Sequence, residues 1–215
     1  SHCINVTGVE CNAQFTYLPI ESEERHDKGR WAPRLRSVRV LGVGTSLDCP
    51  RIGITGGGGN GLGARLSQIA QGTVSVAARN ARISVDVSDA AEVKPWLGRE
   101  SNGTLTHVVH AAGVLRDGML SNIALFDASA VFAPKLNGAT HLHKSTAHVS
   151  LEATILFSSW VALFGSPGQA HYVAANAALD ALASQARMCG RPACALQLPP
   201  VHERGMSATL LAANS

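Results

Sequence analysis

A run of glycines directly after a short apolar segment is the feature that most constrains the fold of this 215-residue chain. Residues 51–63 read RIGITGGGGNGLG, and residues 64–71, ARLSQIAQ, have the composition of a helix start. Glycines permit a tight turn and let backbone N–H groups approach a pyrophosphate at a helix N-terminus. A flexible linker is also rich in glycine. The strand before the run and the helix after it favour a dinucleotide-binding turn.

Further strands are expected downstream. Thr73–Ala78 predicts a second strand, which ends at Arg79, and an arginine there suits bidentate contact with a phosphate and favours NADPH over NADH. The alternative is that Arg79 only solvates the strand end. Ile83–Val87 predicts a third strand and places Asp86 beside an adenine. His107–Gly113 predicts another apolar strand, whose small terminal residues let a cofactor lie flat across its tip.

A second pattern indicates a carbonyl-reducing site. Tyr172 lies thirteen residues after Ser159, and Asn176 lies four residues further on. Leu151–Ser158 predicts a strand that ends at the serine, and Ala170–Arg187 predicts a helix that carries the other two side chains on one face. Reducing a ketone requires a proton donor and a second hydrogen bond at the carbonyl oxygen. Alternatively, the serine caps a turn and the tyrosine is a packing residue.

Composition excludes several classes of function. The chain is 46% hydrophobic and 15% charged, as expected for one globular domain or slightly more. It has no apolar run long enough to cross a bilayer and no signal-peptide pattern at Ser1, so no membrane partner is expected. Its small net charge of +3 and sparse aromatic residues predict no nucleic-acid partner.

Cysteine and histidine usage indicates the compartment. The five cysteines are odd in number and unpatterned, which favours reduced thiols and a cytoplasmic location. The nine histidines show no grouping with recognised ligand spacing, so no metal site is expected.

Several motifs together resemble one known family. Residues 110–118 read HAAGVLRDG, residues 133–139 read APKLNGA, and residues 165–176 read GSPGQAHYVAAN. In these segments, which run in order within residues 51–198, the chain resembles the ketoreductase domain of a type I polyketide synthase, a short-chain dehydrogenase/reductase relative. The resemblance implies an α/β fold, a Rossmann-like doubly wound parallel sheet with helices on both faces.

The resemblance also implies residue roles. Tyr172 is expected to be the general acid, Ser159 to hold the substrate carbonyl, and Asn176 to be the family's asparagine. Lys135 falls on the family's lysine, whose cation stabilises the phenolate of a group with an ordinary pKa of about 10. The alternative for Lys135 is an exposed helix lysine. The residues expected to bind the cofactor are Thr55, Gly57, Gly61, Leu62, Gly63, Arg79, Asp86, Val87, Ala111, Ala112, Gly113 and Pro200.

The implied reaction uses NADPH to reduce a β-keto acyl thioester to a β-hydroxy thioester, in polyketide or fatty-acid-like chain synthesis. The implied partners are an acyl carrier protein, which bears the intermediate on phosphopantetheine, and other synthase domains. Leu115 and Asp117 match one stereochemical signature, and Phe164 replaces the tryptophan of the other class. These positions predict a D-configured hydroxyl.

The chain departs from the family in three places. The glycine turn is one residue longer than expected, and only residues 80–82 separate Arg79 from the next strand. Parallel strands need a connection of a dozen or more residues, so one crossover helix is expected to be missing. Near the end, Pro199 replaces a glycine, and the substrate lid beginning at Gly205 and Met206 is incomplete.

Two regions are expected. Residues 1–50 form a stub of a preceding structural subdomain and a linker, and residues 51–215 form the NADPH-binding catalytic domain. Lys28–Val40 resembles the last strand of the preceding subdomain, but an edge strand or a basic linker fits as well. Three functions remain open: an active ketoreductase, a silent or truncated scaffold in a synthase, and a free-standing reductase of small carbonyls, which HAAGVLRDG disfavours.

Overall fold

The chain divides into two compact units, Ser1–Leu47 and Asp48–Ser215. A computed structural model describes residues 47–59, 61–81, 84–101 and 105–199, together with two short strands of the first unit. These are β1 (Glu24–Arg25) and β2 (Trp31–Ala32), which pair antiparallel. The predictions for Pro200, for the lid start at Gly205 and Met206, and for the rest of the segment 28–40 lie outside the described residues.

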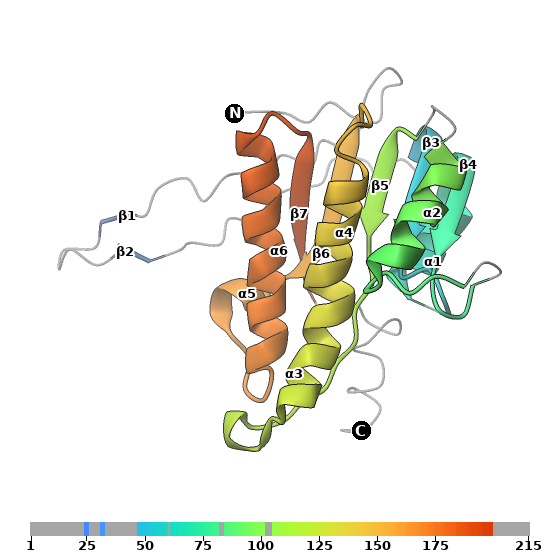
Figure 1. The fold of residues 1–215 in the computed structure, drawn as a ribbon. Helices are drawn as coiled ribbons and strands as arrows, with labels where there is room; N and C mark the ends of the chain where they lie inside the picture. The colour runs from blue at the N-terminus through green and yellow to red at the C-terminus, as the bar shows by residue number, and fades with distance from the viewer. Residues whose placement is uncertain are drawn as a thin grey trace. The chain divides into compact units, whose positions relative to one another are not determined.

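The second unit is built on a five-stranded sheet in the order β4-β3-β5-β6-β7 (Figure 1). Its strands are β3 (Leu47–Thr55), β4 (Ala70–Ala77), β5 (His107–His110), β6 (Ala153–Ser159) and β7 (Ala193–Leu198). The pairs β3 with β5, β5 with β6 and β6 with β7 are parallel. The Gly56 N–H donates to the Ala77 carbonyl at 3.0 Å, so β3 and β4 end at the same edge.

Helices connect the strands in two directions. The described helices are α1 (Leu62–Ile69), α2 (Ala90–Ser101), the 3-10 turn η1 (Leu120–Asn122), α3 (Leu125–Phe132), the π-helical turn η2 (Ala133–Asn137), α4 (Gly138–Ser145), α5 (Val161–Phe164) and α6 (Ala170–Met188). None of them is long and apolar enough to span a membrane. Figure 1 shows α2, α4 and α6 side by side over one face of the sheet.

The two directions of winding confirm the predicted Rossmann-like doubly wound sheet. From β3 the chain passes through α1 to β4 at one end, whereas β5, β6 and β7 follow in the other direction. Because crossovers between parallel strands are right-handed, α1 lies on the opposite face from α4 and α6. A sheet of this topology binds its ligands where the strand order reverses, at the carboxyl edge between β3 and β5.

The crossover helix that was expected to be missing would have come directly after β4. Ala78 pairs with Ser84 in a single parallel bridge, and the described residues between them form a turn. The prediction of a full strand over Ile83–Val87 is therefore wrong, because Ser84 is the one residue of its described part that pairs. A connection this short cannot bring the chain back along β4, so it pairs once and then leaves for α2.

Two clusters of apolar side chains hold the helices on the sheet. The larger lies around Trp96, which is fully buried and donates its indole N–H to the Ser75 hydroxyl at 2.9 Å. The smaller consists of Ala139, Leu156, Leu179, Ala183 and Ala195, with Leu182 packed against it. Alanines dominate this second cluster, so α6 can approach the sheet closely. Close packing there fixes the helix that carries Tyr172.

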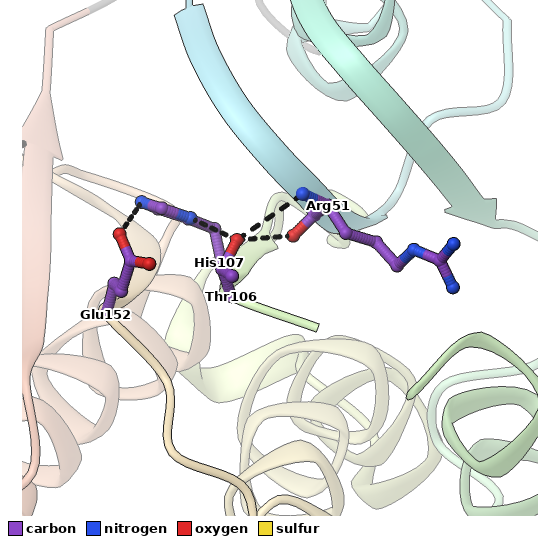
Figure 2. A network of polar contacts seen from close by, with 4 residues as sticks. All are labelled: Arg51, Thr106, His107 and Glu152. Carbon is purple, nitrogen blue, oxygen red and sulfur yellow. Dashed lines mark hydrogen bonds and ion pairs between the residues drawn. The ribbon is translucent and has the colours of Figure 1, made fainter. Parts of the chain in front are cut away.

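A polar network joins the middle of β3 to the starts of β5 and β6, away from the carboxyl edge that carries the predicted site (Figure 2). The Thr106 hydroxyl donates to the Arg51 carbonyl at 2.8 Å and bonds the His107 Nδ1 atom at 2.8 Å. The His107 Nε2 atom lies 4.0 Å from the Glu152 carboxylate. Burial lowers the pKa of His107, and the charge of Glu152 opposes that effect. These contacts fix the register of β3, β5 and β6 relative to one another. From there the three strands run to the carboxyl edge of the sheet.

Candidate active site

A cavity of about 380 Å³ lies where the strand order reverses. Its lining residues follow β3, β4 and β5 or belong to the adjoining turns, and most are small: Gly56, Gly58, Ala77, Ala78, Arg79, Asn80, Val85, Asp86, Val87, Ala111, Ala112, Gly113, Val114 and Pro134. Six of these were predicted to bind the cofactor, namely Arg79, Asp86, Val87, Ala111, Ala112 and Gly113. Gly56 and Gly58 belong to the glycine run that the sequence indicates, whereas only the folded chain brings Asn80, Val114 and Pro134 to the same wall.

The glycine turn needs its glycines for two reasons. Gly56 has φ +76°, and a Cβ atom there would lie 2.5 Å from the Ala111 carbonyl carbon and oxygen. At Gly63, a Cβ atom would lie 2.8 Å from the Gly56 carbonyl oxygen, so this glycine lets α1 pack against the turn. The predicted Gly57, Gly61 and Leu62 belong to the same turn and helix start but do not line the cavity. Gly63 does not line it either.

The polar residues of the cavity lie at the shortened connection after β4. Arg79 and Asn80 are exposed side chains on its wall, and Asn80 lies so near Gly58 that a Cβ atom at that glycine would clash with the Asn80 amide oxygen. Asp86 accepts hydrogen bonds from the Ser88 hydroxyl and, at 2.9 Å, from the Ser88 N–H. These bonds lower the pKa of Asp86, so it is ionised and able to accept further donors.

Tyr172, Ser159 and Asn176 converge at the end of β6 and the start of α6. The Asn176 side-chain amide donates to the Tyr172 carbonyl at 2.8 Å. Burial raises the pKa of Tyr172, while the nearby Asn176 and Ser159 side chains lower it. The negative charge of Asp117 also raises the pKa of Tyr172. The tyrosine therefore holds its proton at neutral pH, as a proton donor requires.

Lys135 joins this group from the π-helical turn. Its side chain is 3% exposed, which excludes an exposed helix lysine. Its ammonium lies 5.2 Å from the centre of the Tyr172 ring and donates to the Phe157 carbonyl at 3.2 Å. Burial lowers the pKa of Lys135 to about 8, and the charge of Asp180 opposes that effect. A cation held there can stabilise a tyrosinate.

His110 is a site residue that sequence reasoning did not identify. Thr55, predicted to bind the cofactor, is fully buried, and its hydroxyl lies 2.6 Å from His110 Nδ1. The His110 Nε2 atom lies 2.9 Å from the Lys135 carbonyl. The one signal in the sequence was a histidine at the start of HAAG, where a strand ends in small residues.

The three residues predicted to control stereochemistry lie on one loop and one short helix. Leu115 and Asp117 belong to the Leu115–Gly118 loop, where the Asp117 carboxylate accepts from the Gln169 amide at 3.0 Å and the Gly118 N–H donates to the Gly168 carbonyl at 2.8 Å. Phe164, the last residue of α5, is 49% exposed and meets Trp160 edge to face, with ring centroids 6.0 Å apart. The hydrogen bonds tie the Leu115–Gly118 loop to the segment before α6, and the charge of Asp117 reaches Tyr172.

Metal ligation has no counterpart in this arrangement. Over the part of the chain that the structure describes, no three His, Cys, Asp or Glu side chains are grouped to hold an ion.

A family model and the curated relatives of this chain indicate the same kind of protein. A family model described as KR domain matches residues 54–203. Polyketide synthase GfsB of Streptomyces halstedii is 42% identical over 126 residues, which are 58% of this chain and 2% of that synthase. The chain thus spans a small fraction of this curated relative.

Solved structures agree with this result. One described as "Structure of A-type Ketoreductases from Modular Polyketide Synthase" matches with a TM-score of 0.69 and 29% identity, over 85% of this chain and 45% of that chain. A short-chain dehydrogenase/reductase of Brucella melitensis, at 16% identity and a TM-score of 0.70 over 79% of this chain and 80% of its own, shows the shared fold alone. Because the KR model matches more than half of this chain, the chain belongs to the KR family, the ketoreductase domains of polyketide synthases.

Proposed function

We propose that this chain catalyses the NADPH-dependent reduction of a β-keto acyl thioester to a β-hydroxy acyl thioester. The observation that carries the proposal is the convergence of Tyr172, Ser159, Asn176 and Lys135 at the carboxyl edge of the sheet. The Ser159 and Asn176 side chains lie near enough to Tyr172 to lower its pKa, and the Lys135 ammonium lies 5.2 Å from the centre of its ring. The cavity at the strand-order reversal opens at the same edge.

The residues of this group divide the work on a carbonyl. Ser159 and Tyr172 each offer a hydroxyl to the carbonyl oxygen, which accumulates negative charge as the carbonyl is reduced. Tyr172 then gives up its proton to that oxygen, and the Lys135 ammonium stabilises the phenolate that remains. Asn176 fixes the first turn of α6 through its bond to the Tyr172 carbonyl.

The cavity fits a dinucleotide in its chemistry. Its wall near β3 includes Gly56 and Gly58, and glycines let backbone N–H groups approach phosphates closely. Arg79 supports a phosphorylated ribose, and ionised Asp86 supports an adenine amino group. NADPH, when bound, would supply the hydride. Gly113 and Val114 would border the part of the cofactor that extends towards Tyr172.

The finer points of the proposal follow the family signatures. An acyl carrier protein with a phosphopantetheine arm would deliver the substrate, since the synthases that resemble this chain are much longer than it is. Leu115, Asp117 and Phe164 support a D-configured product, and Asp117 acts on Tyr172 through its charge. Chiral analysis of the β-hydroxy product tests this assignment, and an L-configured product would contradict it.

A silent scaffold within a synthase is the second candidate function. The connection between Ala78 and Ser84, which has no helix among its described residues, favours it because that turn borders the cavity. The two candidates differ in cofactor binding, which a scaffold does not need.

The test measures NADPH binding by fluorescence, followed by NADPH oxidation with a β-keto thioester surrogate. We expect binding and turnover by the wild-type chain, and a loss of about a hundredfold or more in kcat for Tyr172→Phe, the scale of a general acid. Tyr17→Phe, in the other unit, is the control and retains activity. Absence of NADPH binding would support the scaffold instead.

A further inference from the structure

His110 occupies a central place between the glycine turn and Lys135. It is the last residue of β5 and is fully buried. One ring nitrogen, Nδ1, lies 2.6 Å from the Thr55 hydroxyl at the end of β3, and the other, Nε2, lies 2.9 Å from the Lys135 carbonyl. One imidazole thus bridges a strand end and a helical turn that are far apart in sequence.

The partners determine which nitrogen carries the proton. A carbonyl oxygen only accepts, so Nε2 must donate to Lys135. Nδ1 of the neutral ring is then an acceptor, and the Thr55 hydroxyl donates to it. Burial lowers the pKa of His110 to about 4, which keeps the ring neutral and this pattern intact.

The carbonyl that His110 holds belongs to the residue whose ammonium lies over Tyr172. Lys135 sits in a π-helical turn, closed by a bond from the Gly138 N–H to the Ala133 carbonyl. A Cβ atom at Gly138 would lie 3.0 Å from His110 Cε1, so the glycine allows the turn to approach the imidazole. π-helical turns inside helices are often found at functional sites.

We propose that His110 is a positioning residue, which fixes the backbone of Lys135 and thereby holds the Lys135 ammonium beside Tyr172. Through Thr55, the same side chain ties this lysine to the strand end from which the glycine turn starts. This inference rests on the proposed function, since it assigns His110 a part in the same reaction.

Two substitutions separate the two bonds of the imidazole. In His110→Gln, the side-chain amide nitrogen occupies the place of Nε2 and can still donate to the Lys135 carbonyl. In His110→Asn, the shorter side chain can reach Thr55 but not Lys135. We expect His110→Gln to keep kcat within about threefold of wild type, the size of a small binding difference. We expect His110→Asn to lower kcat by about tenfold or more with little change in KM, because proton donation loses support.

A second measurement reads Lys135 without any reaction. NMR of the protein labelled with ¹⁵N-lysine follows each ammonium against pH, and the Lys135 signal is the one missing in Lys135→Met. We expect a pKa of about 8 in wild type and in His110→Gln. In His110→Asn, we expect a rise of about one unit or more towards the ordinary value of about 10.4, because a displaced ammonium regains water.

Each outcome decides the proposal. If His110→Asn keeps both kcat and the Lys135 pKa, or if His110→Gln is damaged as much as His110→Asn, the proposal is overturned. If His110→Asn does not fold, Gly138→Ala replaces it, since its added methyl group pushes the turn away from His110 and should raise the Lys135 pKa in the same way. If wild type fails to oxidise NADPH, the proposed function fails, while the lysine titration still tests the positioning.

Discussion

At the scale of single residues, the site depends on placing a lysine where water cannot reach it. Lys135 is one of the few buried charged side chains of the described residues, and its ammonium has a backbone carbonyl and the Tyr172 ring as neighbours. Burial of the charge is unfavourable by itself. In the proposed reaction, the same cation would become the partner of a phenolate only after Tyr172 had given up its proton.

The lowered pKa of Lys135 predicts a pH dependence of the reaction. Its folded pKa is about 8, so the ammonium is present below that pH and is lost above it. We expect kcat to be flat from pH 6 to about pH 7.5 and to fall about tenfold per unit at higher pH, as one proton leaves. A pH profile of kcat checks this, with Lys135→Met as the comparison that lacks this limb. A wild-type profile that stays flat to pH 9.5 would contradict it.

Arg79 is expected to decide between the two nicotinamide dinucleotides. Its side chain is exposed on the cavity wall after β4. We expect Arg79→Ala to weaken NADPH binding about tenfold or more, with NADH binding unchanged, because a charged hydrogen bond to the extra phosphate is lost. Fluorescence titration with both cofactors measures this. Arg65→Ala is the matched control, since Arg65 is an exposed arginine of α1 that bonds Gln68 and does not line the cavity.

At the scale of elements, the turn after β3 places its glycines by two different constraints. Gly56 and Gly59 both have positive φ, +76° and +69°. A Cβ atom at Gly56 would lie 2.5 Å from the Ala111 backbone, whereas a Cβ atom at Gly59 would meet nothing within 4 Å. The close approach of Gly56 to Ala111 brings two strand ends together at the cavity.

This difference predicts unequal costs for the same substitution. We expect Gly59→Ala to lower the free energy of unfolding by about 1 kcal/mol, from backbone strain alone. Gly56→Ala should cost about 3 kcal/mol, because the methyl group also displaces Ala111. Denaturant unfolding of both variants checks the prediction. Equal costs would mean that the contact with Ala111 relaxes freely.

The C-terminal end of helix α4 is stabilised by Arg191, a residue far from it in the sequence. The Arg191 guanidinium, just before β7, donates to the His143 and Thr146 carbonyls, each at 2.9 Å, and to the Thr146 hydroxyl at 3.0 Å. A cation at a helix C-terminus is favourable to the helix dipole. The helix that begins at Gly138 beside His110 is therefore held at both ends.

At the scale of the whole molecule, buried neutral histidines make the fold sensitive to acid. In the unfolded chain, His110 titrates near pH 6.5, and in the folded chain its pKa is about 4. Between these values the unfolded state binds a proton that the folded state does not, so the free energy of unfolding falls as pH falls. Burial also lowers the pKa values of His107 and His143, which act in the same direction.

We expect His110 to remove about 3 kcal/mol of stability between pH 6.5 and pH 4. Denaturant unfolding of wild type and His110→Gln at both pH values isolates the contribution, because the other titrating groups are common to the two proteins. The variant should lose less stability over this window by about that amount. Equal losses would show that His110 is protonated in the folded state or is not buried as described.

The sequence alone determined the family of the fold and indicated the groups that are proposed to form the site. Alternating apolar segments, a glycine run and the spacing of Ser159, Tyr172 and Asn176 are local patterns, and local patterns reflect backbone conformation and chemistry directly. The missing crossover helix was likewise readable, because three residues are too few to join neighbouring parallel strands through a helix.

Only the tertiary structure decided how these groups act on one another. It reduced the expected strand over Ile83–Val87 to one bridge at Ser84, turned the Thr55 hydroxyl towards His110, and buried Lys135 over Tyr172. Each of these depends on segments far apart along the chain that meet at one sheet edge. Burial and partners set the charge state of a side chain, and neither is a property of the residue's neighbours in sequence.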